Sequence, residues 1–302
     1  MAPERWTIGD VTITKVEELS GWGPLEERSQ TVPDATREEI EAIAWLNPSY
    51  VRDGTLSMSV HSFLIETPDR KVVVDTGIGN GKQRAMWMFN SLETDFLERF
   101  GQVWAPDEVD GVICTHLHVD HAGWNTRLEG GSWIPTFPRA SYYFAWEEYA
   151  HWQAYARNPA LGAAYTAWAH DMVDGQAVFE DSVRPVAEAG LVAWAQPGGH
   201  ITPEISLLAT PGHTPGHVSV LIESGGESAV ITGDIMHSPF QIARPEWSAS
   251  LDTDQVRSAR TRREFLDRFA GTPTLVLGTH FGTPTGGHVV RDGSSFRLVP
   301  QP

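Results

Sequence analysis

The sequence predicts an α/β fold in which two β-sheets pack face to face and helices cover their outer faces. Strand-like runs occur in two series, each with strands first and helices later, and residues 141–190 join the two series. Because each sheet must bury one face, this order of elements favours a layered sandwich. The chain has 302 residues, of which 41% are hydrophobic, so it can bury a sizeable core. We find no clear linker or repeat and predict a single domain over residues 1–302.

The first predicted elements are a hairpin and an arm. Residues 6–18 alternate apolar and polar side chains around a turn at Gly9-Asp10, which is typical of two antiparallel strands. Residues from about 20–57 are rich in glycine and proline and form an N-terminal arm or insertion. Within this arm, Thr36 begins a capping-box pattern that predicts a short helix. We expect the arm to be either a lid over a cavity mouth or a contact between two copies in a homodimer.

The middle of the chain supplies further strands of the first sheet. Residues 59–65 and 71–75 form two strand-like runs, residues 91–100 are predicted to be a helix, and residues 109–115 the next strand. A helical insertion rich in aromatic residues follows at about residues 145–190.

The last third of the chain predicts the second sheet. Short apolar runs with the length and composition of strands lie at residues 191–195, 206–210, 217–222, 228–232 and 273–277, with one or two more strands at 286–299. Residues 253–269 predict a charged amphipathic helix with Val256, Phe265 and Phe269 on its apolar side.

The composition restricts the classes of function. The net charge is −17, from 22 basic and 39 acidic residues. Such a surface repels phosphate backbones, which argues against nucleic acid and anionic membranes as partners. The one cysteine, Cys114, cannot form an intrachain disulfide, the N-terminus lacks a signal-peptide pattern, and no apolar run is long enough to span a bilayer. We therefore expect a cytoplasmic protein without a membrane partner.

A dense group of metal-ligand side chains follows an apolar, strand-like run. His116, His118, Asp120 and His121 lie within six residues. On an extended segment, side chains at i and i+2 point to one side, so the first two imidazoles are expected to face the same space. Neutral imidazole and carboxylate suit zinc and similar divalent ions. A lone histidine is more often a core residue, but four ligating groups at this density favour half of a metal site.

Three more candidate ligands each follow a strand-like run. His213 lies in a Pro-Gly turn, whereas Asp234 and His280 each follow the end of an apolar run. Side chains at strand ends on one edge of a sheet can converge although they are far apart in sequence. Each alone would be explained as a turn residue, but together they complete a set of seven ligands.

This ordered set, His-x-His-x-Asp-His followed by His, Asp and His, resembles the metallo-β-lactamase-fold hydrolase superfamily. The resemblance spans residues 75–280 and implies a four-layer αββα sandwich of two mixed sheets, with the site at one sheet edge. The ligands that it implies are His116, His118 and His213 for a first metal, Asp120, His121 and His280 for a second, and Asp234 as the bridge. The implied cofactors are two divalent ions, with zinc expected and iron, manganese or cobalt as alternatives.

The pattern also separates this chain from several branches of that superfamily. Enzymes that resemble true β-lactamases often have Cys at the position of Asp234, and the flavin-linked di-iron branch has Glu at the position of His118. The nucleic-acid-processing branch has a large inserted domain and basic surfaces, which are not evident in this acidic chain. The resemblance is therefore to the lactonase and methyl parathion hydrolase-like branch.

The resemblance implies a dinuclear metal-dependent hydrolase in which a metal-bridging hydroxide attacks a small hydrophobic ester or lactone. Open alternatives are a phosphotriesterase-type or hydrolytic dehalogenase activity, a glyoxalase II-like thioesterase, and a non-catalytic metal-binding protein. Asp120 is expected to be catalytic as well as a ligand, because it can orient the nucleophile. His237 stands where the acyl-homoserine lactonase branch has Tyr. It is expected either to donate to the substrate or act as a general acid, or to be structural.

Other residues around the site have expected roles. Asp75, at a strand end, either orients a ligating histidine or caps a turn, and His217, His151 and His170 are expected to be structural. Side chains that the fold would place on cleft-lining loops are Trp22, Trp45, Met86, Trp87, Met88, Phe89, Trp124, Phe240 and Trp247. Most of these rings are expected to pack in the core, but an apolar pocket beside two metals would suit a small hydrophobic substrate.

Overall fold

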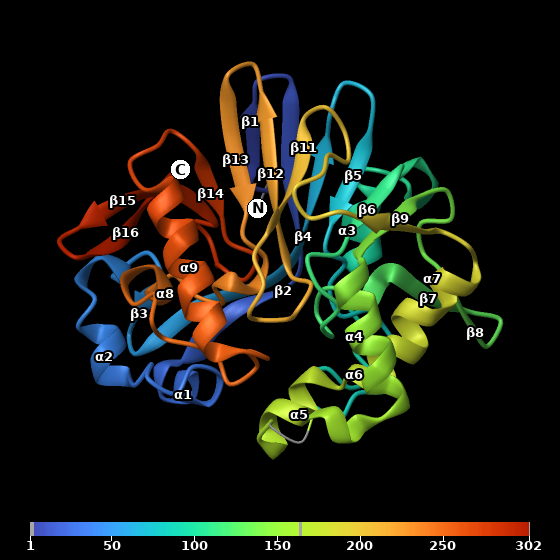
Figure 1. Ribbon diagram of the computed structural model, residues 1–302, viewed down its shortest axis with the longest axis horizontal. Helices are drawn as coiled ribbons and strands as arrows, with labels where there is room; N and C mark the ends of the chain where they lie inside the picture. Colours follow the sequence, from blue (N-terminus) through green and yellow to red (C-terminus); the bar gives the residue numbers. More distant parts are fainter. Residues whose placement is uncertain (1–2, 163–164, 302) are drawn as a thin grey trace.

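Two mixed β-sheets form the centre of the structure (Figure 1), a computed structural model that describes residues 3–162 and 165–301. The described strands of the first sheet lie in the order β1 (Arg5–Ile8), β2 (Val11–Pro24), β4 (Thr55–Glu66), β5 (Lys71–Val74), β6 (Gly111–Ile113), β9 (Ser141–Ala145) and β10 (Val192–Ala195), with β3 (Val51–Arg52) paired to β4. Those of the second sheet lie in the order β11 (Ile205–Ala209), β12 (Val218–Ser224), β13 (Glu227–Ile231), β14 (Leu275–Leu277), β15 (Gly286–Asp292) and β16 (Ser295–Pro300). A separate hairpin consists of β7 (Thr126–Glu129) and β8 (Ser132–Pro135).

Helices cover the outer faces of both sheets (Figure 1). On the side of the first sheet lie α3 (Phe96–Gly101), α4 (Trp146–Arg157), α5 (Ala167–Val173), α6 (Gly175–Val178) and α7 (Arg184–Glu188). On the side of the second sheet lie α8 (Phe240–Ala243) and α9 (Gln255–Phe269). The predicted αββα sandwich is therefore confirmed.

The two sheets enclose one apolar layer between them. Ile13 and Ile113 of the first sheet and Val220 and Ile231 of the second are fully buried in a single cluster. Because side chains alternate along a strand, the opposite faces of the same strands pack against the helices in a second, larger cluster. The six strand regions predicted in the last third of the chain are present, with ends shifted by a residue or two, but β10 (predicted at 191–195) pairs with β9 in the first sheet instead of joining the second.

The predicted arm lies at the tip of a long hairpin. β2 and β4 pair from Thr12 opposite Glu66 to Pro24 opposite Thr55, with a shift of register between Glu17 and Leu19. The two ends of the predicted arm, residues 20–24 and 55–57, therefore belong to the sheet. The tip carries α1 (Arg28–Thr31) and α2 (Arg37–Glu41). The predicted helix is present with Thr36 as its N-cap, since the Thr36 hydroxyl accepts a hydrogen bond of 3.3 Å from the Glu39 amide, but the Thr36 amide donates to the Asp34 carbonyl and the capping box is incomplete.

Some predicted boundaries are wrong. The helix predicted at 91–100 begins only at Phe96, because Ser91 has a positive φ of 52° that no α-helix accommodates. β9 was not predicted, because its aromatic run continues directly into α4. In α9, Phe265 and Phe269 are buried as predicted, but Val256 is 83% exposed in the first turn. Among the described residues, no helix is both long and apolar enough to cross a membrane.

Candidate metal centre

Loops that leave one edge of the two sheets carry the predicted ligands. β5 and β6 are parallel neighbours, as are β13 and β14, and β11 runs in the direction of β13 because both pair antiparallel with β12. The carboxyl ends of these strands meet at one edge, which is where open α/β sheets form their sites. This arrangement brings residues 114–121 together with His213, Asp234 and His280.

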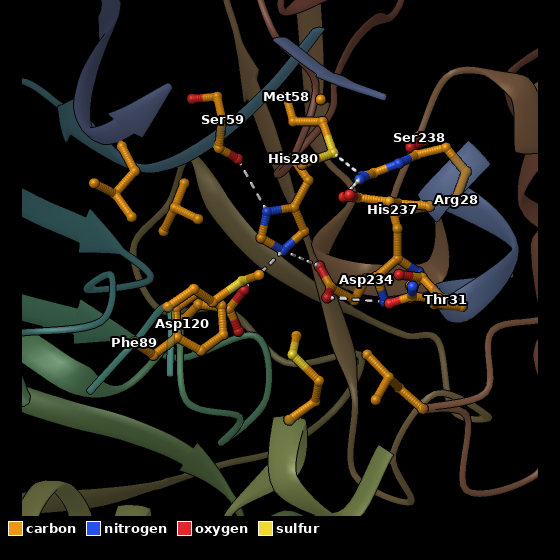
Figure 2. Close-up of a pocket in the computed structure, with 18 of the residues that line it drawn as sticks. Arg28, Thr31, Met58, Ser59, Phe89, Asp120, Asp234, His237, Ser238 and His280 are labelled. Carbon is orange, nitrogen blue, oxygen red and sulfur yellow. Dashed lines mark hydrogen bonds and ion pairs between the residues drawn. The ribbon is translucent and has the colours of Figure 1, made fainter. Parts of the chain in front are cut away.

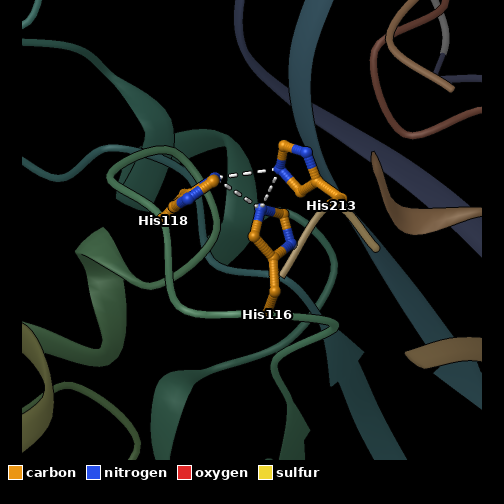
Figure 3. Close-up of side chains that lie close together, drawn as sticks. All are labelled: His116, His118 and His213. Carbon is orange, nitrogen blue, oxygen red and sulfur yellow. Dashed lines mark hydrogen bonds between the residues drawn. The ribbon is translucent and has the colours of Figure 1, made fainter. Parts of the chain in front are cut away.

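Three buried imidazoles point to one place (Figure 3). His213 Nε2 lies 2.9 Å from His118 Nδ1 and 3.2 Å from His116 Nε2. His118 Nδ1 and His116 Nε2 are 3.0 Å apart. Two nitrogens bound to one tetrahedral zinc at about 2.0–2.1 Å would be about 3.3 Å apart, so the observed spacing is close to that of a ligand set.

The protonation of these three rings also fits a cation. Burial is the largest influence and lowers the pKa of His116, His118 and His213, and neighbouring imidazoles lower it further. Neutral imidazole is the form that binds a metal. Since three neutral rings cannot donate a proton to one another at every contact, a shared cation satisfies them better than mutual hydrogen bonds do.

A second group of ligands lies beside the first. His121 Nε2 is 3.2 Å from His280 Nε2 and 3.4 Å from Asp120 Oδ1, and His280 Nε2 is 3.5 Å from Asp120 Oδ2. Burial opposes charge on these rings, but Asp234 and Asp120 outweigh it, raising the pKa of His121 well above its usual range and that of His280 to about 9. Protons on these rings balance the carboxylates, and a divalent cation would supply the same balance.

Asp234 lies between the two groups. Its Oδ2 is 3.3 Å from His121 Nε2 and 3.7 Å from His213 Nε2, and its Oδ1 is 3.3 Å from His280 Nε2. Oδ1 is buried without a hydrogen-bond partner. A carboxylate that faces both groups has the position of a bridging ligand. The seven side chains therefore fit the binding of divalent metal ions.

Carboxylates behind the ligands hold two of the imidazoles in orientation. Asp75 Oδ2 lies 2.9 Å from His121 Nδ1, and Asp252 Oδ1 lies 2.8 Å from His213 Nδ1. Such contacts fix the tautomer and direction of a ligating ring. Asp75 thus contacts a candidate ligand, which agrees with the first of its two expected roles, the orientation of a ligating histidine. Sequence reasoning missed Asp252, which lies 39 residues from its partner and in no recognisable motif.

Two further buried groups position the ligand loops. The His217 Nε2 accepts a 2.8 Å hydrogen bond from the Asp234 amide, which agrees with its expected structural role. Glu148, at the start of α4, accepts hydrogen bonds of 3.0 Å from the amides of Leu117 and Gly216. It therefore ties the 114–121 loop to the loop of His213. Nothing in the sequence around Glu148 indicated this role.

A cavity of about 710 Å³ opens above the ligands (Figure 2). Asp120, Asp234, His237 and His280 lie in its wall, close together in Figure 2. His237 Nε2 is 3.3 Å from Asp234 Oδ2, and neither of its ring nitrogens has a hydrogen-bond partner. Both nitrogens are buried, so the ring is compatible with either expected role, as a donor to a bound molecule or as a structural side chain. His151 and His170 are not among the described lining residues.

The remaining wall is mainly apolar and comes from distant segments. Of the aromatic and methionine side chains predicted to line a cleft, those that do so are Trp22, Trp87, Met88, Phe89 and Phe240. Four others pack in or against the protein core, as was expected of most of these rings: Trp45, Met86, Trp124 and Trp247. Trp124, for example, stacks on Phe96 and donates to Glu18. Trp168 and Met172 of α5 and Met58 of β4 line the cavity without having been predicted.

A model of the metallo-beta-lactamase superfamily matches residues 57–280, and the chain belongs to this superfamily. Its relatives include an N-acyl homoserine lactonase of Bacillus sp., 28% identical over 194 residues, which are 58% of this chain and 63% of that protein. The match thus covers less than two thirds of the length of that lactonase. A probable metallo-hydrolase of Mycobacterium tuberculosis is 24% identical over 249 residues, or 74% of this chain and 75% of the relative.

Solved structures show the same fold. A hydrolase of the beta lactamase superfamily, AbOPH, superposes with a TM-score of 0.80 at 24% identity, covering 100% of this chain and 98% of its own. AidC, a dizinc quorum-quenching lactonase in complex with a product, has a TM-score of 0.78 at 20% identity with the same coverage.

Proposed function

We propose that this chain is a dinuclear metal-dependent hydrolase that acts on small hydrophobic lactones or carboxylic esters. The observation that carries the proposal is the convergence of seven buried or half-buried imidazole and carboxylate ligands at the floor of an apolar-walled cavity. The cavity volume of about 710 Å³ lies within the range of about 300–1,000 Å³ that small-molecule sites occupy.

The ligands divide between two ions. In this proposal His116, His118 and His213 hold the first ion, and Asp120, His121 and His280 hold the second, with Asp234 bridging. The donor set suits zinc, and iron, manganese or cobalt would also fit it. When bound, two such ions lower the pKa of water and polarise a carbonyl oxygen.

Residues of this chain then orient the reactants and move protons. Asp120, whose side chain is 17% exposed, faces the cavity and can accept a hydrogen bond from the attacking water. His237 faces the same space with both ring nitrogens unpaired and can donate to the substrate or protonate the leaving oxygen. The apolar wall excludes water from the acyl part of the substrate.

The lactone substrate is supported by the relatives named N-acyl homoserine lactonase. His237 stands where the lactonase branch carries a tyrosine, and this difference keeps phosphotriesters as a second candidate class. A cytoplasmic location and a homodimer stay predictions.

A substrate panel with controlled metal content tests the proposal. Protein stripped with a chelator should hydrolyse nothing, and zinc, manganese or cobalt should restore turnover of lactones and aryl esters above that of phosphotriesters and chloroaromatics. Full activity without metal, or no turnover of any panel member by fully loaded protein, would contradict it.

A further inference from the structure

One cationic side chain lies in the largely apolar wall of the cavity. Arg28, the first residue of α1, lines the cavity at the tip of the N-terminal arm. It is the one Lys or Arg among the described lining residues. Its side chain is only 13% exposed. A half-buried guanidinium beside an apolar binding space calls for a physical explanation, because removing such a charge from water costs free energy.

The backbone around Arg28 is held by other parts of the protein. The Ser250 amide donates to the Thr31 carbonyl at 2.7 Å, and the Ser250 hydroxyl donates to the Gln30 carbonyl at 3.2 Å. On the other side, a Cβ at Gly23 would lie 3.1 Å from Arg28 Nη2. These contacts hold the backbone that follows Arg28, and the absence of a side chain at Gly23 leaves room for the guanidinium.

The terminal nitrogens of Arg28 lack a strong acceptor. Nε donates to the Pro24 carbonyl at 3.2 Å, whereas Nη1 contacts the thioether sulfur of Met58, as Figure 2 shows. Nη2 is 3.6 Å from Glu27 Oε2, which is longer than a hydrogen bond. A thioether is a weak acceptor, and a guanidinium offers five N–H donors. Donors thus remain available to a molecule in the cavity.

We infer that Arg28 is a specificity-determining residue that donates hydrogen bonds to a neutral carbonyl acceptor on the substrate, remote from the carbonyl that is attacked. The inference rests on the proposed function and narrows it to hydrophobic lactones or esters whose acyl part carries an amide or ketone. A neutral acceptor is favoured over a carboxylate because the carboxylate of Glu27 also lines this cavity and would repel a second anion. Asp120 and Asp234 add negative charge to the same cavity.

A pair of matched lactones tests this role. N-hexanoyl homoserine lactone carries an amide carbonyl, and α-heptyl-γ-butyrolactone has a side chain of the same length without it. Zinc-loaded wild-type protein should favour the amide in kcat/KM by about 10-fold or more, the usual effect of one charge-assisted hydrogen bond. In Arg28→Met this ratio should fall by about 10-fold from its wild-type value, mainly because KM rises for the amide substrate. The kcat/KM of the alkyl lactone should stay within about 3-fold of its wild-type value. Arg28→Lys, which keeps the charge but loses the planar fork, should give an intermediate ratio.

Arg37→Met is the matched control. Arg37 lies on the same arm but pairs with Glu26 and Glu41 outside the cavity, so its removal should leave the ratio unchanged. A ratio that persists in Arg28→Met, or equal losses on both lactones, would overturn the inference while leaving the proposed function intact. If loaded wild-type protein hydrolysed neither lactone nor any ester of the panel, the proposed function would fail. The dissociation constants of the two lactones, measured by calorimetry, would then test the role of Arg28. Their ratio should change between wild type and Arg28→Met if Arg28 contacts the amide, and should stay the same if it does not.

Discussion

The floor and the wall of the cavity are built in different ways. The floor consists of imidazoles and carboxylates on short loops at strand ends, and further carboxylates hold some of the rings, as Asp252 accepts a hydrogen bond from His213 Nδ1. The wall is assembled from the N-terminal arm, the loop around Trp87 and helix α5, which are far apart in sequence. Trp87 is 80% exposed, whereas His213 is buried. The comparison suggests that the chemistry is built into the sheet edge, while substrate choice depends on segments appended to it.

The largest expected effect comes from the floor. Asp234→Ala removes the carboxylate that faces both ligand groups. Loss of a residue that only orients a ligand typically costs 10- to 100-fold, so loss of the bridge should cost more than about 100-fold in kcat on every substrate. Steady-state kinetics over the panel would measure this. A near-normal rate on any member would show that Asp234 is not the bridge.

His237 lies where floor and wall meet. The loss of kcat when it is replaced should depend on how good the leaving group of the substrate is. His237→Phe should lower kcat by about 100-fold on alkyl lactones, which need a proton donor, and by less on aryl esters with good leaving groups. His151→Phe is the control, since His151 also has an unpaired buried ring nitrogen but is not a lining residue. An equal loss on both substrate types would assign His237 a structural role.

Asp252 tests whether the floor depends on its support. Asp252→Asn keeps the shape of the side chain but removes the charge that orients His213, so zinc affinity should fall by about 10- to 100-fold at unchanged substrate preference. Competition with a chromophoric chelator would measure the affinity. Asp254→Asn, which alters the N-cap of α9 two residues away, should leave it unchanged. Equal affinities in the two variants would mean that Asp252 does not support the metal site.

The smallest effect is expected at the exposed wall. Trp87→Ala should raise KM by less than about 10-fold for long-chain substrates, with kcat and melting temperature unchanged, because an exposed ring contributes little to folding. Trp146→Ala is a control, as Trp146 is 53% exposed but is not a lining residue. A loss of kcat or of bound metal in Trp87→Ala would contradict the assignment of the wall to substrate binding alone.

The same distinction explains what could be predicted from the sequence. His116 and Asp234 could be named because ligand side chains are chemically distinctive and follow recognisable strands, and the layers followed from the order of strands and helices. Asp252 could not, because its contact with His213 depends on how the chain folds back after 39 residues. The wall depends on packing, which sequence patterns do not specify. Trp124 therefore turned out to be a core residue, and Trp168 turned out to line the cavity.

The number of metal ions per chain is the most direct test of the two-ion site. Native mass spectrometry of zinc-loaded protein should show two ions bound per chain in the wild type, because the proposed ligands form two groups with Asp234 between them. A single ion at saturating zinc, or none, would contradict the dinuclear centre.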